Sequence, residues 1–418
     1  MTFAPSKTLA LSNFAAFSSF SQASRSWFLS AFPEGPTPVQ EQAWAAIGRG
    51  ENALVVAPTG SGKTLAAFFS AIDRLGRRSA EDRRGKGVQV LYVSPLKALA
   101  ADVERNLRRP LAGVEQAARD LQETGETRAT PGAAFELPRT TVGMRTGDTP
   151  AKERRRLRVN PPDILITTPE SLYLMLTSEA RKTLGAVSTV IVDEIHSLAG
   201  SKRGTHLALS LERLDAMLEE PAQRIGLSAT VSPARTVADF LGGSRPVTII
   251  EADSAANPDV AVSVPVDDMA AIPPASVAGQ MVVSMWPHIE RAILDHVLKH
   301  RTTVVFVNSR GVCERLTAHL NEEYANRFGG EAAIAKSHHG SVSKDQRLTV
   351  ENELKSGSLR CVVATSSLEL GIDMGSIDLV LQVAPPLSVA SGLQRIGRAN
   401  HAVGGRPRGA IYPVERTH

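Results

Sequence analysis

The sequence has few cysteines and few aromatic residues, and it has no long apolar run. Only Cys313 and Cys361 occur among 418 residues, which argues against a disulfide framework and fits a reducing compartment. The two cysteines lack zinc-site spacing and the ten histidines are scattered, so we expect no structural metal. No apolar stretch reaches the roughly 18 residues that suggest a membrane span. Aromatic residues make up 5% of the chain, which does not indicate the base-stacking platforms of single-strand-binding proteins.

The N-terminal segment does not fit a secretory signal. Its aromatic residues are interspersed with serines: Phe14, Phe17, Phe20, Trp27 and Phe28. No continuous apolar core follows a basic start, as a signal peptide would require. Together with the cysteine content, this predicts a cytoplasmic protein.

The bulk composition is that of an ordinary globular protein. Hydrophobic residues make up 42% of the chain and charged residues 22%. A length of 418 residues suggests two or three domains. The net charge of +4 and the isoelectric point near 9.1 permit a nucleic-acid partner but do not establish one.

Buried-strand patterns recur along the chain and alternate with helical patterns, which predicts parallel sheets with crossover helices. In the first half they are Ala53–Val56, Val88–Val93, Ile164–Ile166, Val187–Val192 and Arg224–Leu227. In the second half they are Thr303–Val307, Ala332–Ser337, Cys361–Thr365, Leu379–Val383 and Gly409–Pro413. A proline- and alanine-rich stretch separates the two sets. The sequence therefore predicts two α/β domains, residues 1–243 and 286–418, with a linker-like region at 244–285 that has one or two strands of its own.

Two segments do not read as core. The segment from Ala112 to Pro138 is rich in Gly, Thr, Glu and Arg, and we expect a surface insertion with one helical piece. The segment from Lys152 to Arg158 is strongly basic. A solvated helix face is the expected interpretation of such a run, and a patch that contacts nucleic-acid backbone is the alternative.

The most informative motif is Ala57 to Thr64, which reads Ala-Pro-Thr-Gly-Ser-Gly-Lys-Thr. An apolar run precedes it and apolar residues at helical spacing follow it, so it connects a strand to a helix as a phosphate-binding loop does. The residues expected to hold the phosphates are Thr59, Gly60, Ser61, Gly62, Lys63 and Thr64. Lys63 would reach the β- and γ-phosphates, and the Thr64 hydroxyl would hold Mg²⁺. The alternative is a glycine-rich turn that binds nothing.

An acidic pair, Asp193 and Glu194, directly follows the predicted strand Val187–Val192. The carboxyl end of a buried parallel strand is where such sheets bind ligands. Asp193 is placed to hold Mg²⁺ through its water shell, and Glu194 to position and deprotonate an attacking water. The alternative is a helix start with acidic capping residues.

The order of several motifs resembles that of superfamily 2 helicases. The main ones are the phosphate loop, Asp193-Glu194-Ile195-His196, Leu227-Ser228-Ala229-Thr230 and Gln394-Arg395-Ile396-Gly397-Arg398. Further stretches fit the same pattern: Pro36–Gln40, Val93–Leu99, Thr167–Leu172, Val304–Arg310, His338–Ser341 and Ala364–Asp373. The resemblance implies two tandem RecA-like domains, each a mainly parallel sheet flanked by helices. It also accounts for Ala57 in place of a glycine, because this superfamily's loop commonly reads Ala-x-Thr-Gly-x-Gly-Lys-Thr.

Three stretches look like the large helicase-related proteins of bacteria: Arg145–Pro150, Asp193–Gly204 and Gln394–His401. This resemblance implies an ATP- and Mg²⁺-dependent helicase that moves 3′ to 5′ on single-stranded DNA. It further implies unwinding of DNA or RNA–DNA duplexes with little sequence specificity, a role in DNA repair, and a cytoplasmic, nucleoid-associated location. Members of that family continue beyond the two motor domains, so we expect this chain to be the N-terminal motor fragment of a longer protein.

The resemblance assigns the nucleotide site to both domains. Gln40 is expected to read the adenine base, and Asp373 and Gln394 to line the same cleft. Arg398, with Arg395 as a second candidate, would bring positive charge to the departing γ-phosphate, whose transition state spreads charge over its oxygens.

The last motif departs from the common superfamily pattern. His401 stands where many members have a second arginine, and Asn400 stands in place of a glycine. We expect His401 to couple nucleotide and strand rather than to contact the γ-phosphate. A polar residue that is hydrogen-bonded beneath the loop is the alternative.

The candidates for a nucleic-acid track are Pro95, Lys97, Thr168, Pro169, Ser309, Arg310 and Thr365. Their hydroxyls, cations and helix starts suit phosphate contacts, which position a strand without reading its sequence. We therefore expect strong salt dependence. Ser228 and Thr230 are expected to link the ATP site to the strand.

Alternatives to a helicase remain at this point. One is a nucleic-acid-stimulated ATPase that moves along a strand without separating duplexes. Another is a scaffold with an idle ATP site, against which Lys63, Asp193, Glu194 and Arg398 argue. A third is kinase-like phosphoryl transfer on the same loop.

Overall fold

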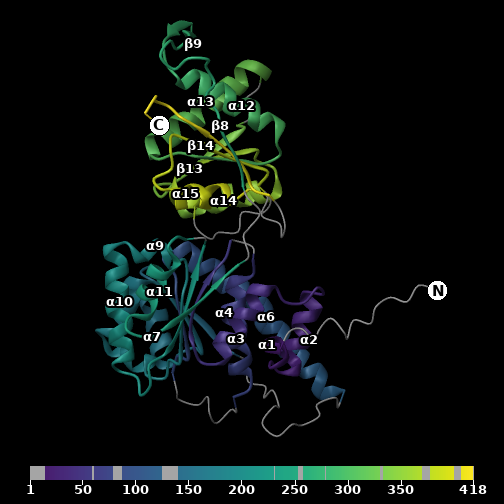
Figure 1. The fold of residues 1–418 in the computed structure, drawn as a ribbon, viewed down its shortest axis with the longest axis vertical. Coiled ribbons are helices and arrows are strands. Elements are labelled where there is room, and N and C mark those ends of the chain that lie inside the picture. Colours follow the sequence, from purple (N-terminus) through teal and green to yellow (C-terminus); the bar gives the residue numbers. More distant parts are fainter. Residues whose placement is uncertain are drawn as a thin grey trace, which may run out of the picture. The chain divides into compact units, whose positions relative to one another are not determined.

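The computed structural model describes residues 15–58, 61–78, 87–124, 140–229, 231–252, 258–277, 279–329, 333–369, 377–399 and 406–417. The chain divides into two compact units, Met1–Asp253 and Ser254–His418 (Figure 1). Each unit has its own parallel sheet and its own core, so each is described by itself.

The first unit is built on a seven-stranded sheet in which every paired strand is parallel. The strands lie in the order β3 (Val142–Arg145), β4 (Ile164–Thr167), β2 (Val90–Val93), β5 (Thr189–Val192), β6 (Gln223–Ser228), β1 (Asn52–Val56) and β7 (Val247–Glu251). Strands β1, β2, β4 and β5 are buried along their whole length, as a parallel sheet covered on both faces requires. Because the strands are parallel, the loops after β1 and β5 leave the sheet at the same edge.

Helices cover both faces of this sheet (Figure 1). One face carries α1 (Ala15–Ser18), α2 (Gln22–Ala31), α3 (Pro38–Gly48), α4 (Lys63–Gly76) and α6 (Lys97–Glu123). The other carries α8 (Pro169–Leu176), α9 (His196–Ala199), α10 (Lys202–Asp215) and α11 (Ala234–Gly242). Between these elements, α7 (Ala151–Val159) follows β3, and the 3₁₀ helix η2 (Glu179–Leu184) follows α8. The side chains of β1 alternate accordingly, with Ala53 and Val55 in one core and Leu54 and Val56 in the other.

The aromatic N-terminal segment is part of the first core. Phe17, Phe20 and Phe28 pack with Trp44 of α3 and Phe69 of α4. The ring centroid of Phe28 lies 5.2 Å from those of both Phe17 and Phe69, and that of Phe20 lies 5.0 Å from that of Trp44. Offset and edge contacts at these separations add to the energy of burial. The segment therefore stabilises the face of the sheet that carries α4.

The second unit has a six-stranded sheet, also parallel throughout. Its strands lie in the order β12 (Ala335–His338), β13 (Cys361–Ala364), β11 (Thr303–Phe306), β14 (Leu379–Val383), β15 (Arg408–Tyr412) and β8 (Asp259–Val262). One core contains side chains of α12 (Trp286–Lys299) and α13 (Arg310–Phe328), and the other those of α14 (Lys344–Ser356) and α15 (Val389–Ile396). The 3₁₀ helix η3 (Ser366–Leu368) follows β13.

Both cysteines lie inside the second unit. Cys313 of α13 and Cys361 of β13 are fully buried and are not joined in a disulfide. Burial raises the pKa of the Cys313 thiol to about 11 and that of the Cys361 thiol to about 12. Neither thiol therefore forms an appreciable thiolate at neutral pH.

The segment 244–285, which the sequence suggested as a linker-like region, contributes a strand to each sheet. β7 pairs with β1 in the first unit, and β8 pairs with β15 in the second. Only β9 (Ala275–Val277) and β10 (Gln280–Val282) pair with each other. All residues of β8 are exposed, so the sequence shows no buried run there.

Candidate nucleotide site and nucleic-acid surface

The phosphate loop connects β1 to α4, as the sequence predicts. The described residues of the loop at the start of α4 are Ser61, Gly62, Lys63 and Thr64, whereas Thr59 and Gly60 lie outside the described residues. Gly62 precedes the helix with φ of 80°, a left-handed conformation that glycine adopts without strain. Lys63 is buried as the first helical residue. The helix start thus presents backbone N–H groups and a buried cation, which together favour an anion.

Gln40 of α3 packs against this loop. Its Nε2 donates to the carbonyl oxygen of Gly62 at 3.4 Å, and its Oε1 accepts the backbone N–H of Thr37 at 2.9 Å. The Thr37 hydroxyl accepts the backbone N–H of Gln40 in return, which completes a capping box. A Cβ atom on Gly62 would lie 2.5 Å from Gln40 Nε2, so the contact leaves no room for a side chain. Gln40 therefore supports the loop, and adenine recognition by its amide stays a prediction.

Asp193 leaves the end of β5 with both carboxylate oxygens oriented. Its Oδ2 accepts a short hydrogen bond from the Tyr92 hydroxyl of β2, and its Oδ1 accepts the backbone N–H of Glu194 at 2.9 Å. Burial, followed by the charge of Glu194, raises the pKa of Asp193 to about 6, while the Tyr92 bond and Lys63 act in the opposite direction. A buried carboxylate of this kind favours a cation beside it.

Glu194 is held in a strained position next to Asp193. Its backbone has φ of 43°, in the left-handed region that non-glycine residues rarely adopt. Its side chain is buried, and Oε2 has no hydrogen-bond partner among the described residues. A buried carboxylate oxygen without a partner can accept a hydrogen bond from water, as an activated nucleophile requires.

His196 connects Glu194 to the end of β6. The backbone N–H of Ala229 donates to His196 Nδ1 at 3.3 Å, and the Ser228 hydroxyl lies 3.1 Å from the same nitrogen. Because Nδ1 accepts, the neutral ring carries its proton on Nε2, which lies 3.6 Å from Glu194 Oε2. The motif Leu227–Thr230 thus contacts the acidic pair through one imidazole, although Thr230 itself lies outside the described residues.

The track candidates of the first unit differ in exposure. Lys97, the first residue of α6, is exposed and its Nζ lies 2.5 Å from Asp148 Oδ1. Pro95, Thr168 and Pro169 are buried, and Pro169 begins α8. Lys97 is therefore the side chain of this group that presents charge to solvent.

The track candidates of the second unit follow the carboxyl ends of neighbouring strands. Ser309 caps α13 after β11, and Arg310 Nη1 donates to Ser341 Oγ at 2.6 Å. Thr365 follows β13, and its backbone N–H donates to the carbonyl oxygen of His338 at 3.3 Å. These segments therefore lie side by side at one sheet edge.

The arginines of the last motif are bound within the second unit. Arg395 is buried and bonds to Glu369 Oε2 at 3.0 and 3.2 Å, Gln382 Oε1 at 2.7 Å and Asn308 Oδ1 at 3.2 Å. Arg398 is also buried, and its Nη2 donates to the carbonyl oxygen of Glu369 at 2.8 Å. The sequence pointed to Arg395 as a nucleotide contact, whereas these bonds direct its guanidinium into the interior of the unit.

The other candidates of the second unit are described in part. Gln394 lies on α15 and is partly exposed. Asp373, Asn400 and His401 lie outside the described residues. Their expected roles stay predictions.

Sequence reasoning did not find Tyr92, Glu369 or the Arg395 acceptors Asn308 and Gln382. Tyr92 carried a weak signal, because it is a polar side chain in an otherwise apolar buried strand. Asn308 and Glu369 lie inside the helicase-like stretches Val304–Arg310 and Ala364–Asp373, but no signal pointed to their contacts with Arg395, because those contacts join residues distant in the sequence.

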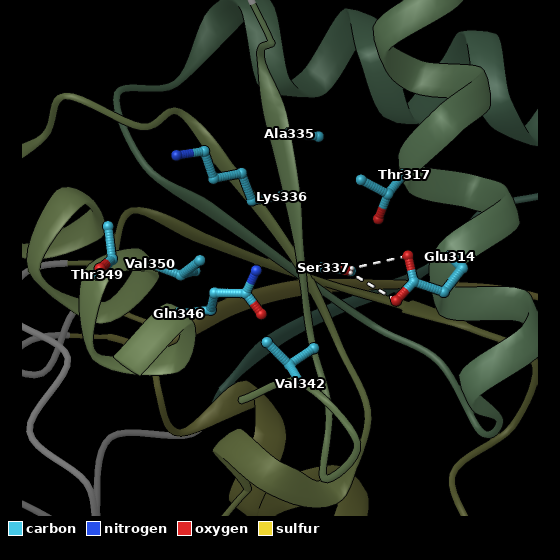
Figure 2. Close-up of a pocket in the computed structure, with 9 residues that line it drawn as sticks. All are labelled: Glu314, Thr317, Ala335, Lys336, Ser337, Val342, Gln346, Thr349 and Val350. Carbon is cyan, nitrogen blue, oxygen red and sulfur yellow. Dashed lines mark hydrogen bonds between the residues drawn. The ribbon is translucent and has the colours of Figure 1, made fainter. Parts of the chain in front are cut away.

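A cavity of about 490 Å³ lies in the second unit. Figure 2 shows its walls, which α13, β12, α14 and the turn after β12 supply: Glu314, Thr317, Ala335, Lys336, Ser337, Val342, Gln346, Thr349 and Val350. The Ser337 hydroxyl bonds to both carboxylate oxygens of Glu314 at 3.1 Å. That carboxylate makes the cavity unsuited to a phosphate.

The described residues contain neither a ready-made metal-binding cluster nor a membrane-spanning helix. Among the described residues, no group of three or more His, Cys, Asp or Glu side chains could hold a metal ion by itself. No helix in the described ranges has the length and apolar character to cross a membrane.

Comparison with known proteins agrees with this geometry. The DEAD/DEAH box helicase family matches residues 37–240, and the helicase conserved C-terminal domain matches residues 288–402. The Lhr helicase/uracil glycosylase of Escherichia coli is 55% identical over 95% of this chain and 27% of its own length. The ATP-dependent helicase Lhr-Core of Methanothermobacter thermautotrophicus is 42% identical over 93% of the chain and 43% of its own length. The chain therefore spans well under half the length of these relatives.

A solved structure extends the likeness to three dimensions. Mycobacterium smegmatis helicase Lhr, bound to single-stranded DNA and AMP-PNP, matches with a TM-score of 0.82 and 56% identity. The match covers 96% of this chain and 49% of that one. The likeness thus extends over nearly the whole chain, and the chain belongs to the Lhr family of superfamily 2 ATP-dependent helicases.

Proposed function

We propose that this chain is an ATP-dependent motor that couples ATP hydrolysis to 3′-to-5′ movement on single-stranded DNA and unwinds DNA or RNA–DNA duplexes. The observation that carries the proposal is the buried Glu194 carboxylate directly beside Asp193; the Oε2 of Glu194 has no hydrogen-bond partner among the described residues and lies 3.6 Å from His196 Nε2. A scaffold with an idle ATP site would have no reason to maintain a strained, desolvated carboxylate there.

The residues of the first unit fit Mg²⁺ and ATP. Asp193 and Glu194 are two adjacent buried carboxylates, and the cation Lys63 is close enough to lower the pKa of Asp193. Asp193 and the Thr64 hydroxyl would hold Mg²⁺, partly through water, and Lys63 with the helix start would hold the phosphates. Bound Mg²⁺ would neutralise charge on the phosphate oxygens. Glu194 would then orient the attacking water and accept its proton.

Arg398 is the residue that we propose for the γ-phosphate, and Gln394 for the same nucleotide. Removing an arginine that stabilises this transition state costs about 10³–10⁵ in turnover. The strand would lie on Lys97, Arg310 and the neighbouring candidates, which contact phosphates rather than bases. The single-stranded DNA and AMP-PNP bound to the 56% identical Lhr structure support a nucleotide site and a strand site in this chain, and the residues named here are our assignment.

A second function stays open, because the chain spans only 27% of the E. coli relative. It is an ATPase that moves along a strand without separating duplexes. Measuring strand displacement on tailed DNA–DNA and RNA–DNA duplexes distinguishes the two. Displacement of either duplex supports the helicase, and strand-stimulated ATPase without displacement supports the translocase.

The test of the motor itself is ATP turnover with and without single-stranded DNA. We expect stimulation by the strand and loss of turnover in Lys63→Ala. Turnover that does not change when the strand is added would contradict the proposal.

We also propose that the protein acts in DNA repair in the cytoplasm. A bacterial strain that lacks the gene should then be sensitive to DNA damage, and a Lys63→Ala copy should fail to restore its resistance.

A further inference from the structure

Arg395 joins three segments of the second unit that are far apart in the sequence. It lies on α15, its side chain is 1% exposed, and its guanidinium is spread over acceptors from each segment. Nε and Nη2 bond to Glu369, while Nη1 bonds to both Asn308 and Gln382. The guanidinium also lies over the Phe306 ring, 5.3 Å from its centroid.

Asn308 links this network to a strand-binding segment. It directly precedes Ser309 and Arg310, the candidates for phosphate contacts after β11. Its Oδ1 accepts from Arg395, and its Nδ2 donates to the carbonyl oxygen of Pro385 at 2.8 Å. The side-chain amide of Asn308 therefore fixes the start of α13 relative to α15.

Glu369 links the network to a second strand-binding segment and to the proposed γ-phosphate arginine. It follows Thr365 by one turn of η3 and supplies the only carboxylate in this network of described residues. Its carboxylate bonds to Arg395, and its carbonyl oxygen accepts from Arg398. One residue thus connects the segment after β13 to both arginines of the last motif.

Gln382 links the network to the bend that starts α15. Its Oε1 accepts from Arg395, and its Nε2 donates to the carbonyl oxygens of Val383 at 3.0 Å and Ala384 at 2.8 Å. Ala384 has φ of 63°, a left-handed conformation that is unfavourable for alanine. The amide therefore stabilises a strained bend that sets the direction of the helix leading to Arg398.

We infer that Arg395 is a positioning residue that couples strand binding to ATP hydrolysis, by fixing the segments of Arg310 and Thr365 relative to Arg398. This inference rests on the proposed function. A buried guanidinium is suited to the task because its planar fork bonds several acceptors at fixed angles, whereas an ammonium presents a single point charge. Strand contacts that shift Asn308 or the segment of Glu369 are thereby transmitted to Arg398 through one rigid group.

The experiment compares ATP turnover with and without single-stranded DNA in Arg395→Lys and Asn308→Ala. Lysine keeps the charge beside Glu369 but lacks the planar guanidinium, whose Nε, Nη1 and Nη2 reach the three separated acceptors. We expect Arg395→Lys to lower the ratio of strand-stimulated to strand-free turnover by about tenfold or more, within the range of measured coupling between sites. Asn308→Ala, a substitution outside the nucleotide site, should lower the same ratio while strand-free turnover is unchanged.

Two further measurements separate positioning from folding and from direct nucleotide contact. Thermal unfolding of each variant reports its stability. If Arg395→Lys does not fold, the ratio measured in Asn308→Ala still tests whether the network couples strand binding to ATP turnover. The double variant should lower the ratio no further than Arg395→Lys alone, because both remove the same link. Equal loss of strand-free and stimulated turnover in Arg395→Lys, with a normal ratio in Asn308→Ala, would overturn the inference. Absence of stimulation in the unmodified protein would refute the proposed function instead.

Discussion

Replacing Tyr92 with phenylalanine isolates the contribution of one hydroxyl to the proposed Mg²⁺ site. The Tyr92 hydroxyl donates to Asp193 Oδ2, and the ring packs on Phe68 with centroids 5.0 Å apart. Phenylalanine keeps the ring and its packing, so Tyr92→Phe removes only the donor. Asp193 then retains the backbone N–H of Glu194 as the partner of its other oxygen.

The size of the effect follows from the charge of the acceptor. A hydrogen bond to a charged group contributes about 1.5–3 kcal/mol, and losing an outer partner of a metal ligand typically costs about 10- to 100-fold in metal affinity. Burial already raises the pKa of Asp193 to about 6, and the Tyr92 bond opposes that shift. Without the hydroxyl the pKa of Asp193 rises further. Protons then compete more strongly with Mg²⁺, which requires the ionised carboxylate.

The assay is the Mg²⁺ dependence of strand-stimulated ATP turnover between about pH 5.5 and 8. We expect the half-saturating Mg²⁺ concentration of Tyr92→Phe to rise at every pH and to rise most at low pH. Turnover at saturating Mg²⁺ should recover most of its original value. The matched control is Tyr412→Phe, which removes the hydroxyl of a buried tyrosine that lies in the second unit instead of the first. It should leave the Mg²⁺ dependence unchanged. An unaltered Mg²⁺ dependence in Tyr92→Phe would refute the assignment of Asp193 as a Mg²⁺ ligand positioned by this bond.

Three further predictions concern separate features. Gly62→Ala forces the Gln40 amide to move and places a Cβ at φ of 80°, where alanine is strained, so ATP binding, measured by fluorescence titration, should weaken by about tenfold or more as the loop shifts. Arg224→Ala removes a buried guanidinium that bonds to Asp215, to the exposed Glu212 and to the carbonyl oxygen of Leu241, and should cost about 1.5–3 kcal/mol in urea unfolding, against about 1 kcal/mol or less for the exposed pair lost in Arg235→Ala. Lys97→Ala should lower the slope of log affinity against log salt by about one, equally for all strand sequences; a change that depends on sequence would contradict a phosphate contact.

The placement of the candidate residues in the first unit could be predicted because they follow short, buried strands. The strands before Ala57 and Asp193 are buried throughout and mostly apolar, and glycine, lysine and acidic residues directly after such strands are typical of a nucleotide site. The central strands of both sheets were found for the same reason. The basic run at Lys152–Arg158 was also predicted correctly as a helix with mostly exposed side chains, α7.

Edge strands and long-range pairs could not be predicted. β3 and β8 are partly or wholly exposed, so they lack the fully buried pattern of the central strands, and β7 carries a mostly apolar run, Val247–Ile250, but lies in the segment interpreted as linker-like. The helical piece expected after Ala112 is present as the end of α6, but the expectation of a surface insertion was wrong up to Glu123, because α6 continues past Pro110 and buries Val114 and Ala118. The residues 125–139 lie outside the described residues.

The role of a motif residue also depends on acceptors that the sequence does not reveal. Arg395 and Arg398 stand three residues apart and are chemically alike, and the resemblance ranked Arg398 first but kept Arg395 as a second nucleotide contact. The fold places Glu369, Gln382 and Asn308 around Arg395. Only the three-dimensional structure shows that the Arg395 guanidinium donates hydrogen bonds to these three side chains. The same holds for Tyr92 and Asp193, which are 101 residues apart.

The burial of both cysteines makes the natural chain suitable for site-specific labelling. Maleimide dyes react with thiolates, and Cys313 and Cys361 combine full burial with pKa values raised to about 11 and about 12. New cysteines at exposed positions, one in each unit, could therefore be labelled without first removing the native pair. Energy transfer between two such dyes would report, in single molecules, how the separation of the units changes as ATP is bound and hydrolysed.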